Sequence, residues 1–244
     1  MPARSLARLA LAVSLAATAC RAAPEPPSPG ERPALGVMTT LPLIWAEAGD
    51  VGELLAAEAS TGWVRQELAG RFALEPLDTL DEASLAPLKR LVLAQPRALT
   101  PAENVALDAW VRGGGRLLLF ADPMLTRQSR YAVGDRRRPQ DVALLSPILA
   151  HWGLELLFDD AQGQGERNHE IVGRAVPLNL AGGFRIIAGS SSCAAAPGAV
   201  LVRCRVGKGQ VVALADAAVL DDPESGDFAL RRAALGHLLG LAFD

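Results

Sequence analysis

Six polar residues stand where short apolar runs of this sequence end, and they are the best candidates for binding a ligand. They are Thr39, Thr40, Gln95, Arg97, Asp122 and Asp216. In open α/β sheets, ligands bind beyond the carboxyl ends of the strands, which is where these side chains would lie. The Asp-Pro pair at Asp122 could instead terminate a strand and cap a turn, so both roles stay open for this carboxylate.

The sequence offers no recognisable pair of nucleophile and base. Nucleophilic catalysis needs a nucleophile beside an oriented base, and the chain has three histidines. His151 ends a helical segment and His237 lies beside an apolar stripe, so packing or capping explains both. No G-x-S-x-G elbow, phosphate-binding loop or dinucleotide-binding fingerprint occurs. We therefore predict no catalytic residues.

His169 is the only histidine placed for metal binding. With Asp159 and Asp160 it could form a site for a hard cation, but no fixed ligand spacing supports one. We predict neither a metal nor a cofactor. Gly207-Lys208-Gly209 is a weak match to a phosphate-binding turn and is better explained as the tip of a β-hairpin.

The loop from Thr126 to Gln140 should cross the carboxyl edge of the sheet. It carries Arg127, Arg130, Arg136, Arg137 and Arg138. These arginines could form an anion or partner site at the strand ends. We favour a solvated surface loop, because nothing in it forms a phosphate-cradling pattern.

Residues 90–123 contain the clearest structural pattern. The apolar runs at 91–94 and 117–120 are typical of strands buried on both faces. Between them, Thr100 and Glu103 form a capping box at the start of a helix, with proline at its first position. This helix should carry Val105, Ala106, Ala109 and Trp110 on one face. The whole segment is a βαβ unit, which is almost always right-handed.

Further elements are expected around this unit. Strands are predicted at 34–40, 72–77, 154–158, 169–172 and 182–188, and helices within 47–60, 61–68, 79–88, 141–152 and 227–241. Residues 199–206 and 210–215 should pair as a hairpin. Pro76 makes its strand an edge strand, and Asp141 should N-cap its helix. The predicted fold is α/β: a mostly parallel sheet with helices on both faces, plus a C-terminal hairpin and closing helix.

The N-terminus has the pattern of a bacterial lipoprotein leader. Arg4 and Arg8 precede an apolar run too short to span a bilayer, which ends at Ala17-Thr18-Ala19-Cys20. We predict a leader at 1–20, lipid attachment at Cys20, a proline-rich tether at 21–33 and one domain at 34–244. An ordinary cleaved signal peptide is the alternative. The chain would face the periplasm from a membrane, with the outer membrane slightly favoured because no aspartate follows Cys20.

The composition argues against a nucleic-acid partner and allows a disulfide. The charges nearly balance, with 24 basic and 27 acidic residues, so we predict no nucleic-acid binding. Cys193 and Cys204 flank a Pro-Gly turn, eleven positions apart, which suits a disulfide between neighbouring strands of an exported protein. Two separate buried thiols are the alternative.

In order and spacing, these elements resemble the extracytoplasmic domain of gliding-motility-type auxiliary ABC-transport proteins. The matching segments are 39–43, 91–93, 99–100, 106–108, 113–123, 145–149, 152–154, 206–209 and 215–216. That family's fold looks like the class I glutamine-amidotransferase fold, which is close to a flavodoxin-like arrangement. The resemblance implies ABC-transporter permease and ATPase subunits as partners. Two features depart from these relatives: a lipid anchor replaces spanning helices, and Gln95-Pro96-Arg97 stands where the related enzymes carry a cysteine nucleophile.

The leading functional hypothesis is a lipid-anchored, non-catalytic binding or accessory component of an ABC-type transport or envelope system. A second hypothesis is an envelope- or sugar-directed hydrolase that uses carboxylates such as Asp122 at the strand ends. A third is a solute-binding protein. Fold alone does not decide among them.

Overall fold

The computed structural model of the 244-residue chain describes residues 32–47, 62–189, 191–223 and 228–244. Several predictions concern residues outside these ranges. They are the leader, Cys20, most of the tether, and the short helix expected within 47–60.

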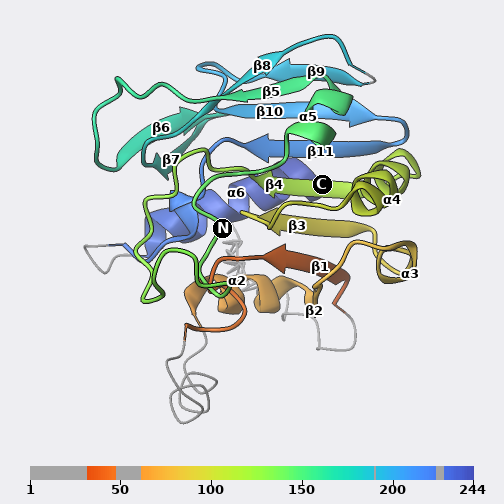
Figure 1. Cartoon of the computed structure of the whole chain (residues 1–244), viewed down its shortest axis with the longest axis horizontal. Coiled ribbons are helices and arrows are strands. Elements are labelled where there is room, and N and C mark those ends of the chain that lie inside the picture. Colours follow the sequence, from red (N-terminus) through yellow and green to blue (C-terminus); the bar gives the residue numbers. More distant parts are fainter. Residues whose placement is uncertain (1–31, 48–61, 190, 224–227) are drawn as a thin grey trace, which may run out of the picture.

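A seven-stranded sheet forms the centre of the molecule, in the order β2-β1-β3-β4-β11-β10-β9 (Figure 1). Its strands are β1 (Ala34–Thr39), β2 (Ala73–Pro76), β3 (Arg90–Ala94), β4 (Arg116–Phe120), β9 (Ser192–Ala195), β10 (Leu201–Val206) and β11 (Gly209–Leu214). The first five strands in that order are parallel to one another, and β10 runs antiparallel to both of its neighbours, β11 and β9. The mostly parallel sheet, the edge position of the Pro76 strand and the β10–β11 hairpin are confirmed.

Helices cover both faces of this sheet. They are α2 (Trp63–Arg71), α3 (Glu82–Leu85), α4 (Pro101–Arg112), α5 (Ser146–Trp152) and α6 (Ala229–Phe243), with a 3₁₀ turn at Ala218–Leu220. Alternation along β4 shows the two cores: Leu118 and Phe120 pack with α2 and α6, whereas Leu117 and Leu119 pack with α3, α4 and α5. The predicted layers and the closing helix are therefore confirmed.

Capping residues fix where two helices begin. The Thr100 side chain accepts from the Glu103 N–H at 3.2 Å, and the Glu103 carboxylate accepts from the Thr100 N–H at 2.8 Å, as the sequence predicts. Asp81 and Ser84 form the equivalent pair at α3. α4 lies in the connection between the parallel strands β3 and β4, and α3 lies in the connection between β2 and β3.

The face of α4 that packs on the sheet is not the one marked by the sequence pattern. Leu107 and Val111 are fully buried, whereas Val105 is 71% exposed. Val105, Ala106, Ala109 and Trp110 instead line an open apolar groove of about 790 Å³ between α3 and α4. The helix is apolar on two faces, so periodicity alone could not decide which one faces the sheet.

The helix expected at 141–152 is shorter than predicted. It begins at Ser146, with Leu145 rather than Asp141 as its N-cap. Pro147 lacks the N–H that a longer helix would need, so it lies in the first turn. The Asp141 carboxylate pairs instead with Arg138 at 3.0 Å, and the Ala143 N–H donates to the Asp122 carbonyl.

Other differences are local. α2 continues through Gly70 to Arg71 instead of ending before Gly70. Two small antiparallel sheets lie outside the central one: β5 (Leu154–Leu157) with β8 (Gly183–Ile186), and β6 (Arg167–Ile171) with β7 (Arg174–Leu178). The sequence pattern did not predict β7 or β9. In the described ranges, no helix is long and apolar enough to cross a bilayer.

Candidate functional site

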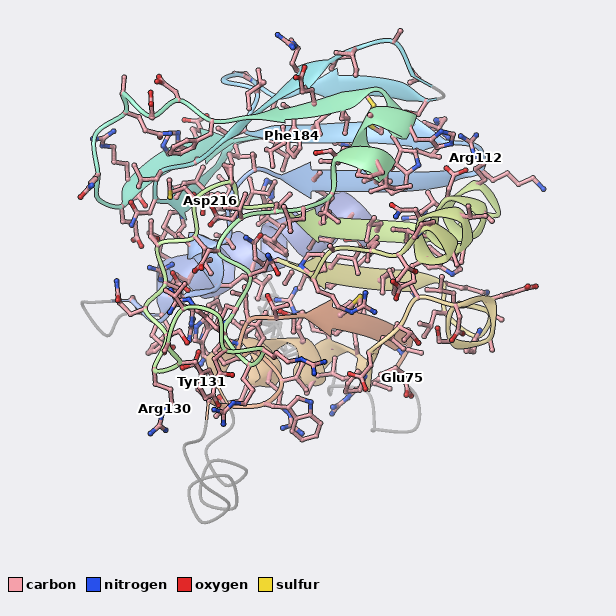
Figure 2. All side chains as sticks on the ribbon, viewed as in Figure 1. Glu75, Arg112, Arg130, Tyr131, Phe184 and Asp216 are labelled. Atoms are coloured by element: carbon pink, nitrogen blue, oxygen red, sulfur yellow. A yellow bond between two sulfur atoms is a disulfide. The ribbon has the colours of Figure 1, made fainter. Side chains whose placement is uncertain are left out.

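Three of the predicted site residues follow adjacent strands and are completely buried. Gln95, Asp122 and Asp216 follow β3, β4 and β11, and each is 0% exposed. Figure 2 shows Asp216 at the carboxyl edge of the sheet, opposite Arg112 at the amino edge. The topology therefore brings these side chains together, as predicted, but it encloses them in protein.

Gln95 joins the ends of β3 and β4. Its Nε2 donates to the carbonyls of Asp122 and Gln140, each at 2.9 Å, and its Oε1 accepts from the Asp122 N–H at 2.9 Å. Its backbone φ is 44°, in the left-handed region that non-glycine residues rarely adopt. This strained turn directs the amide inward, where every hydrogen bond it makes is to backbone.

The carboxylates of Asp122 and Asp216 both cap backbone N–H groups. Asp122 accepts from Met124 at 2.8 Å and from Ala217 at 3.1 Å. Asp216 accepts from Asn179 at 2.8 Å and from Ala218 at 2.5 Å. All four carboxylate oxygens therefore have a partner, which is the structural role left open for Asp122.

Burial shifts the pKa of both carboxylates upward. Desolvation raises the pKa of Asp122 to about 6, although the Met124 and Ala217 N–H groups oppose the rise. Desolvation, and then the negative charge of Asp122, raise the pKa of Asp216 well above its usual value. The two groups repel each other when ionised, so each makes the other harder to deprotonate.

The two threonines bind loop backbone. The Thr40 hydroxyl donates to the Gln95 carbonyl at 2.5 Å and accepts from the Gln140 N–H at 2.9 Å. The Thr39 hydroxyl accepts from the Leu41 N–H at 2.9 Å. We call the three buried residues Gln95, Asp122 and Asp216 the strand-end cluster. Thr40, which is partly buried, binds the backbone beside this cluster.

Arg97 does not join the strand-end cluster. Its guanidinium binds both oxygens of Glu103, at 2.9 and 2.6 Å, and donates to the Asp78 carbonyl at 2.7 Å. This bidentate pair holds the pKa of Glu103 at about 2. Arg97 therefore fastens the turn after β3 to the first turn of α4, and a ligand role would require breaking that pair.

An open cleft of about 710 Å³ lies beside the strand-end cluster, and we call it the strand-end cleft. Asn179 and Ala218, whose N–H groups bind Asp216, line it together with Arg127, Glu166, Asp221 and Arg231. Arg127 and Asp221 form an ion pair at 2.8 Å. Burial raises the pKa of Asp221, and the two arginines oppose the rise. The cleft therefore offers fixed charges of both signs to a polar ligand.

Sequence reasoning missed Arg231, which is 3% exposed and donates to the Ala218 carbonyl and to Glu166. A signal was present. Arg231 shares a helical face with Ala234, Leu235 and Leu238, and a charged residue in an apolar stripe needs a buried partner. Glu166 and Asp221 carried no such signal, because they lie in irregular segments.

The arginine-rich loop is neutralised in part by nearby acids. Arg137 pairs with Asp135 at 2.7 Å and Arg138 with Asp141 at 3.0 Å. The backbone N–H of Arg130 donates to the Glu47 carboxylate at 2.9 Å, and its guanidinium donates to the Glu47 carbonyl at 3.4 Å. Only Arg127, among the five arginines, lines the strand-end cleft. These contacts favour the structural interpretation of the loop over an anion site.

The remaining candidates occupy other places. Asp159 and His169 line one shallow hollow, which does not include Asp160. No group of three His, Cys, Asp or Glu side chains suited to a metal occurs in the parts of the chain that the structure describes. Cys193 and Cys204 face each other on β9 and β10 and form a disulfide, with 4.0 Å between their Cα atoms.

Two histidines have structural partners. His151 lies 3.3 Å from the Asp108 carboxylate, which also binds Arg112 and the indole of Trp152. This network joins α4 to α5. The His237 Nε2 lies 3.0 Å from the Ile171 carbonyl, so it joins α6 to β6.

The fold and the polar strand ends define a class: an α/β domain whose carboxyl edge is closed by its own loops, beside an open cleft. A family model described as "ABC-type uncharacterized transport system" matches residues 32–171, more than half of the chain. The chain belongs to this family. No curated protein matches it.

Solved structures show only distant likeness. A catalytic mutant of Gan42B, a GH42 β-galactosidase from G. stearothermophilus, is 14% identical with a TM-score of 0.47, over 86% of this chain and 30% of that one. Protein STM1381 from Salmonella typhimurium is 12% identical with a TM-score of 0.41, over 86% of this chain and 98% of that one. A protein described as ThuA-like, from Bacteroides uniformis, is 12% identical with a TM-score of 0.38, over 86% of this chain and 91% of that one. The chain thus spans under a third of the galactosidase, and no function follows from these likenesses.

Proposed function

We propose that this chain is a lipid-anchored, non-catalytic accessory component of an ABC-type transport system. Its parts would be a lipoprotein leader at 1–20, lipid attachment at Cys20, a tether at 21–33 and the α/β domain at 34–244. The family match, which begins at residue 32, supports both the transport association and the start of the domain. In this proposal the domain faces the periplasm, with the outer membrane slightly favoured.

One observation carries the non-catalytic part of the proposal: the strand-end cluster is sealed and its polar atoms are used. Catalysis by Asp122 or Asp216 would need a substrate atom within hydrogen-bonding reach. Both residues are 0% exposed, and their oxygens already accept from backbone N–H groups. A pKa near 6 for Asp122 reflects this burial, and by itself it does not indicate a general acid.

The same turn supports an amidotransferase-like fold without its chemistry. An amidotransferase holds its nucleophile on a strained turn between strand and helix. Here Gln95 occupies the turn after β3 with a φ of 44°. The strained geometry is present, but the side chain is an amide that binds the neighbouring strand end. We infer that the turn has a structural role in this chain.

Purification from membranes tests the proposal. The full chain, with a C-terminal tag, would be expressed in its native host and isolated in mild detergent. We expect acyl chains on Cys20 by mass spectrometry, and co-purification of an ATPase and a permease. A Cys20→Ser variant should lose the acyl chains. An acylated chain that recovers no transporter subunit would overturn the transport role, whereas an unmodified Cys20 would overturn the anchor.

A second function, binding of a small polar solute, is favoured by the strand-end cleft. Its arginines and carboxylates could bind a solute that carries both charges. A screen of polar solutes by thermal shift would test this, with Arg127→Gln as the matched variant. If no solute raises the melting temperature, or if Arg127→Gln leaves the shift unchanged, the solute-binding role is wrong.

A further inference from the structure

The amino edge of the sheet carries an unusual row of arginines. In the strand register, Arg90 lies opposite Arg116, Arg116 opposite Gln210, and Gln210 opposite Arg205. Register partners point to the same face, so this row crosses four neighbouring strands on the face that α6 covers. Arg203 lies two residues from Arg205, on the same face. The described part of the chain gives none of these four guanidiniums a hydrogen bond or ion pair.

Such a row is unfavourable unless an anion neutralises it. Like charges directly opposite each other on neighbouring strands repel and destabilise the sheet. Several other arginines of the chain pair with acids, as in the Arg97–Glu103 and Arg127–Asp221 pairs. Within the described residues the row has no such pair, and in it Arg90 and Arg116 stand directly opposite each other, so an anion from outside the chain would relieve their repulsion.

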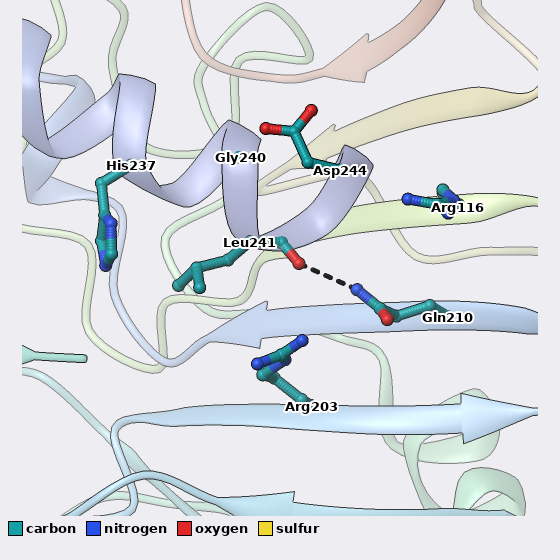
Figure 3. Close-up of a pocket in the computed structure, with 7 residues that line it drawn as sticks. All are labelled: Arg116, Arg203, Gln210, His237, Gly240, Leu241 and Asp244. Atoms are coloured by element: carbon teal, nitrogen blue, oxygen red, sulfur yellow. Dashed lines mark hydrogen bonds between the residues drawn. The ribbon is translucent and has the colours of Figure 1, made fainter.

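A hollow of about 390 Å³ lies between the row and the end of α6 (Figure 3). Arg116 and Arg203 lie on its sheet side, and His237 and Asp244 on its helix side. Gln210 spans the two by donating to the Leu241 carbonyl at 2.8 Å. Asp244 is the one acid among the residues that line the hollow, and it is exposed at the helix end. Arginine forks suit phosphate oxygens in both geometry and charge.

The described chain starts at this edge of the sheet, where a tether from the proposed lipid anchor would join it. β1 begins at Ala34, on the same edge, and the Pro33 carbonyl accepts from the Ala73 N–H where β2 begins. The tether at 21–33 can extend at most about 45 Å. A domain held through Cys20 would therefore keep its amino edge near the bilayer. Lys89 and Lys208 are exposed at this edge as well.

We propose that the basic edge, formed by Lys89, Arg90, Arg116, Arg203, Arg205 and Lys208, docks on the phosphate groups of anionic phospholipids. Arg116 and Arg203 would hold one headgroup phosphate at the hollow. The orientation of the docked domain rests on the lipid anchor proposed above, but the binding of headgroups does not. The competing explanation is that these arginines only offset the negative end of the α6 dipole.

The test uses the unlipidated chain from Arg21 onward, which keeps every described residue and therefore the whole core. Co-sedimentation would compare phosphatidylcholine vesicles with vesicles that contain about 30 mol% phosphatidylglycerol. We expect binding to the anionic vesicles only, weakening as salt is added. The double variant Arg116→Gln/Arg203→Gln should bind about thirtyfold more weakly.

A matched double variant supplies the control. Arg136→Gln/Arg174→Gln removes the same charge from exposed positions that lie on neither the hollow nor the row. It should weaken binding less than threefold, roughly the effect of net charge alone. If the control variant loses as much vesicle affinity as the edge variant, or if the wild type binds vesicles equally with and without phosphatidylglycerol, the proposal is wrong. Circular dichroism would check folding, and Arg205→Gln gives a second, independent variant of the row.

One further outcome would also be decisive. If the edge variant binds vesicles normally but loses recovery of a transporter subunit, the surface binds an acidic partner and the membrane proposal is overturned. The vesicle test involves neither acyl chains nor a transporter. Its failure would therefore leave the proposed function standing, and a failure of co-purification would leave the vesicle result standing.

Discussion

Replacing Asp122 by asparagine should change how the stability of this protein depends on pH. Asp122 is fully buried, and desolvation raises its pKa to about 6 from 3.8. Between these two values the folded state keeps a proton that the unfolded state has lost. The free energy of unfolding therefore falls as the pH rises through this window. Below it, the carboxyl group is neutral in both states and the penalty disappears.

The structure sets the size of this effect. A shift of about two pKa units corresponds to about 3 kcal/mol, and the linkage relation places about 1 kcal/mol of it between pH 5 and pH 7. Asp216 acts in the same direction, because burial and Asp122 raise its pKa too. The asparagine of the variant would stay neutral but could accept from only one of the Met124 and Ala217 N–H groups, which costs about 1 to 3 kcal/mol. At pH 7 the two effects roughly cancel.

Urea unfolding at pH 5, 6 and 7 would measure this, with the midpoint and slope fitted at each pH. The wild type should lose stability from pH 5 to pH 7 by about 1 kcal/mol more than Asp122→Asn. Asp160→Asn, which removes an exposed carboxylate, should keep the wild-type dependence. If Asp122→Asn and the wild type have the same dependence, Asp122 is not the buried, proton-binding group that the structure describes.

Four other substitutions test three separate parts of the structure. Glu103→Gln should cost about 2 to 3 kcal/mol at pH 7, because Arg97 lowers the pKa of Glu103 to about 2. The difference in the free energy of unfolding between wild type and variant should disappear as the pH falls from about 4.5 to 2. Urea unfolding would measure this difference at each pH. A difference that stays constant over this range would contradict the ion pair. Cys204→Ser should lower the free energy of unfolding by about 2 to 3 kcal/mol, because it opens the loop closed by a disulfide between cysteines eleven positions apart. The melting temperature should fall accordingly. A reductant should lower the melting temperature of the wild type in the same way and leave that of the variant unchanged. Leu107→Ala should cost about 2 to 5 kcal/mol, whereas Val105→Ala should cost under about 1 kcal/mol; equal costs would mean that the wrong face of α4 has been assigned to the core.

Local signals predicted much of the fold. The capping box at Thr100 and Glu103, the apolar runs of β3 and β4 and the Gly207–Gly209 hairpin tip each depend on neighbours within a few residues. Steric and hydrogen-bonding requirements of this short range are visible in the sequence itself. The close approach of Gly209 to α4 is not, because a Cβ there would lie 2.0 Å from the carbonyl oxygen of Val111, which is far away in the chain.

The sequence likewise predicted one part of the candidate site and not the other. The rule that polar residues gather at the carboxyl ends of parallel strands brought Gln95, Asp122 and Asp216 together correctly, because only strand order is needed. It could not show that their polar atoms are used by backbone groups, because most of those contacts join segments 27 to 100 residues apart in the chain. It also did not show that Arg97 turns to Glu103, although these two residues are only six positions apart.

By itself, the sequence determined most of the elements, their order and the residues at the strand ends, since propensity, capping and periodicity act over short distances. Only the tertiary structure decided which apolar face of α4 is buried and that Arg231 lies inside the protein. It also decided that arginines from β3, β4 and β10 form one row. Register between strands and packing between helices are long-range choices, and they are made by burial and pairing across the whole domain.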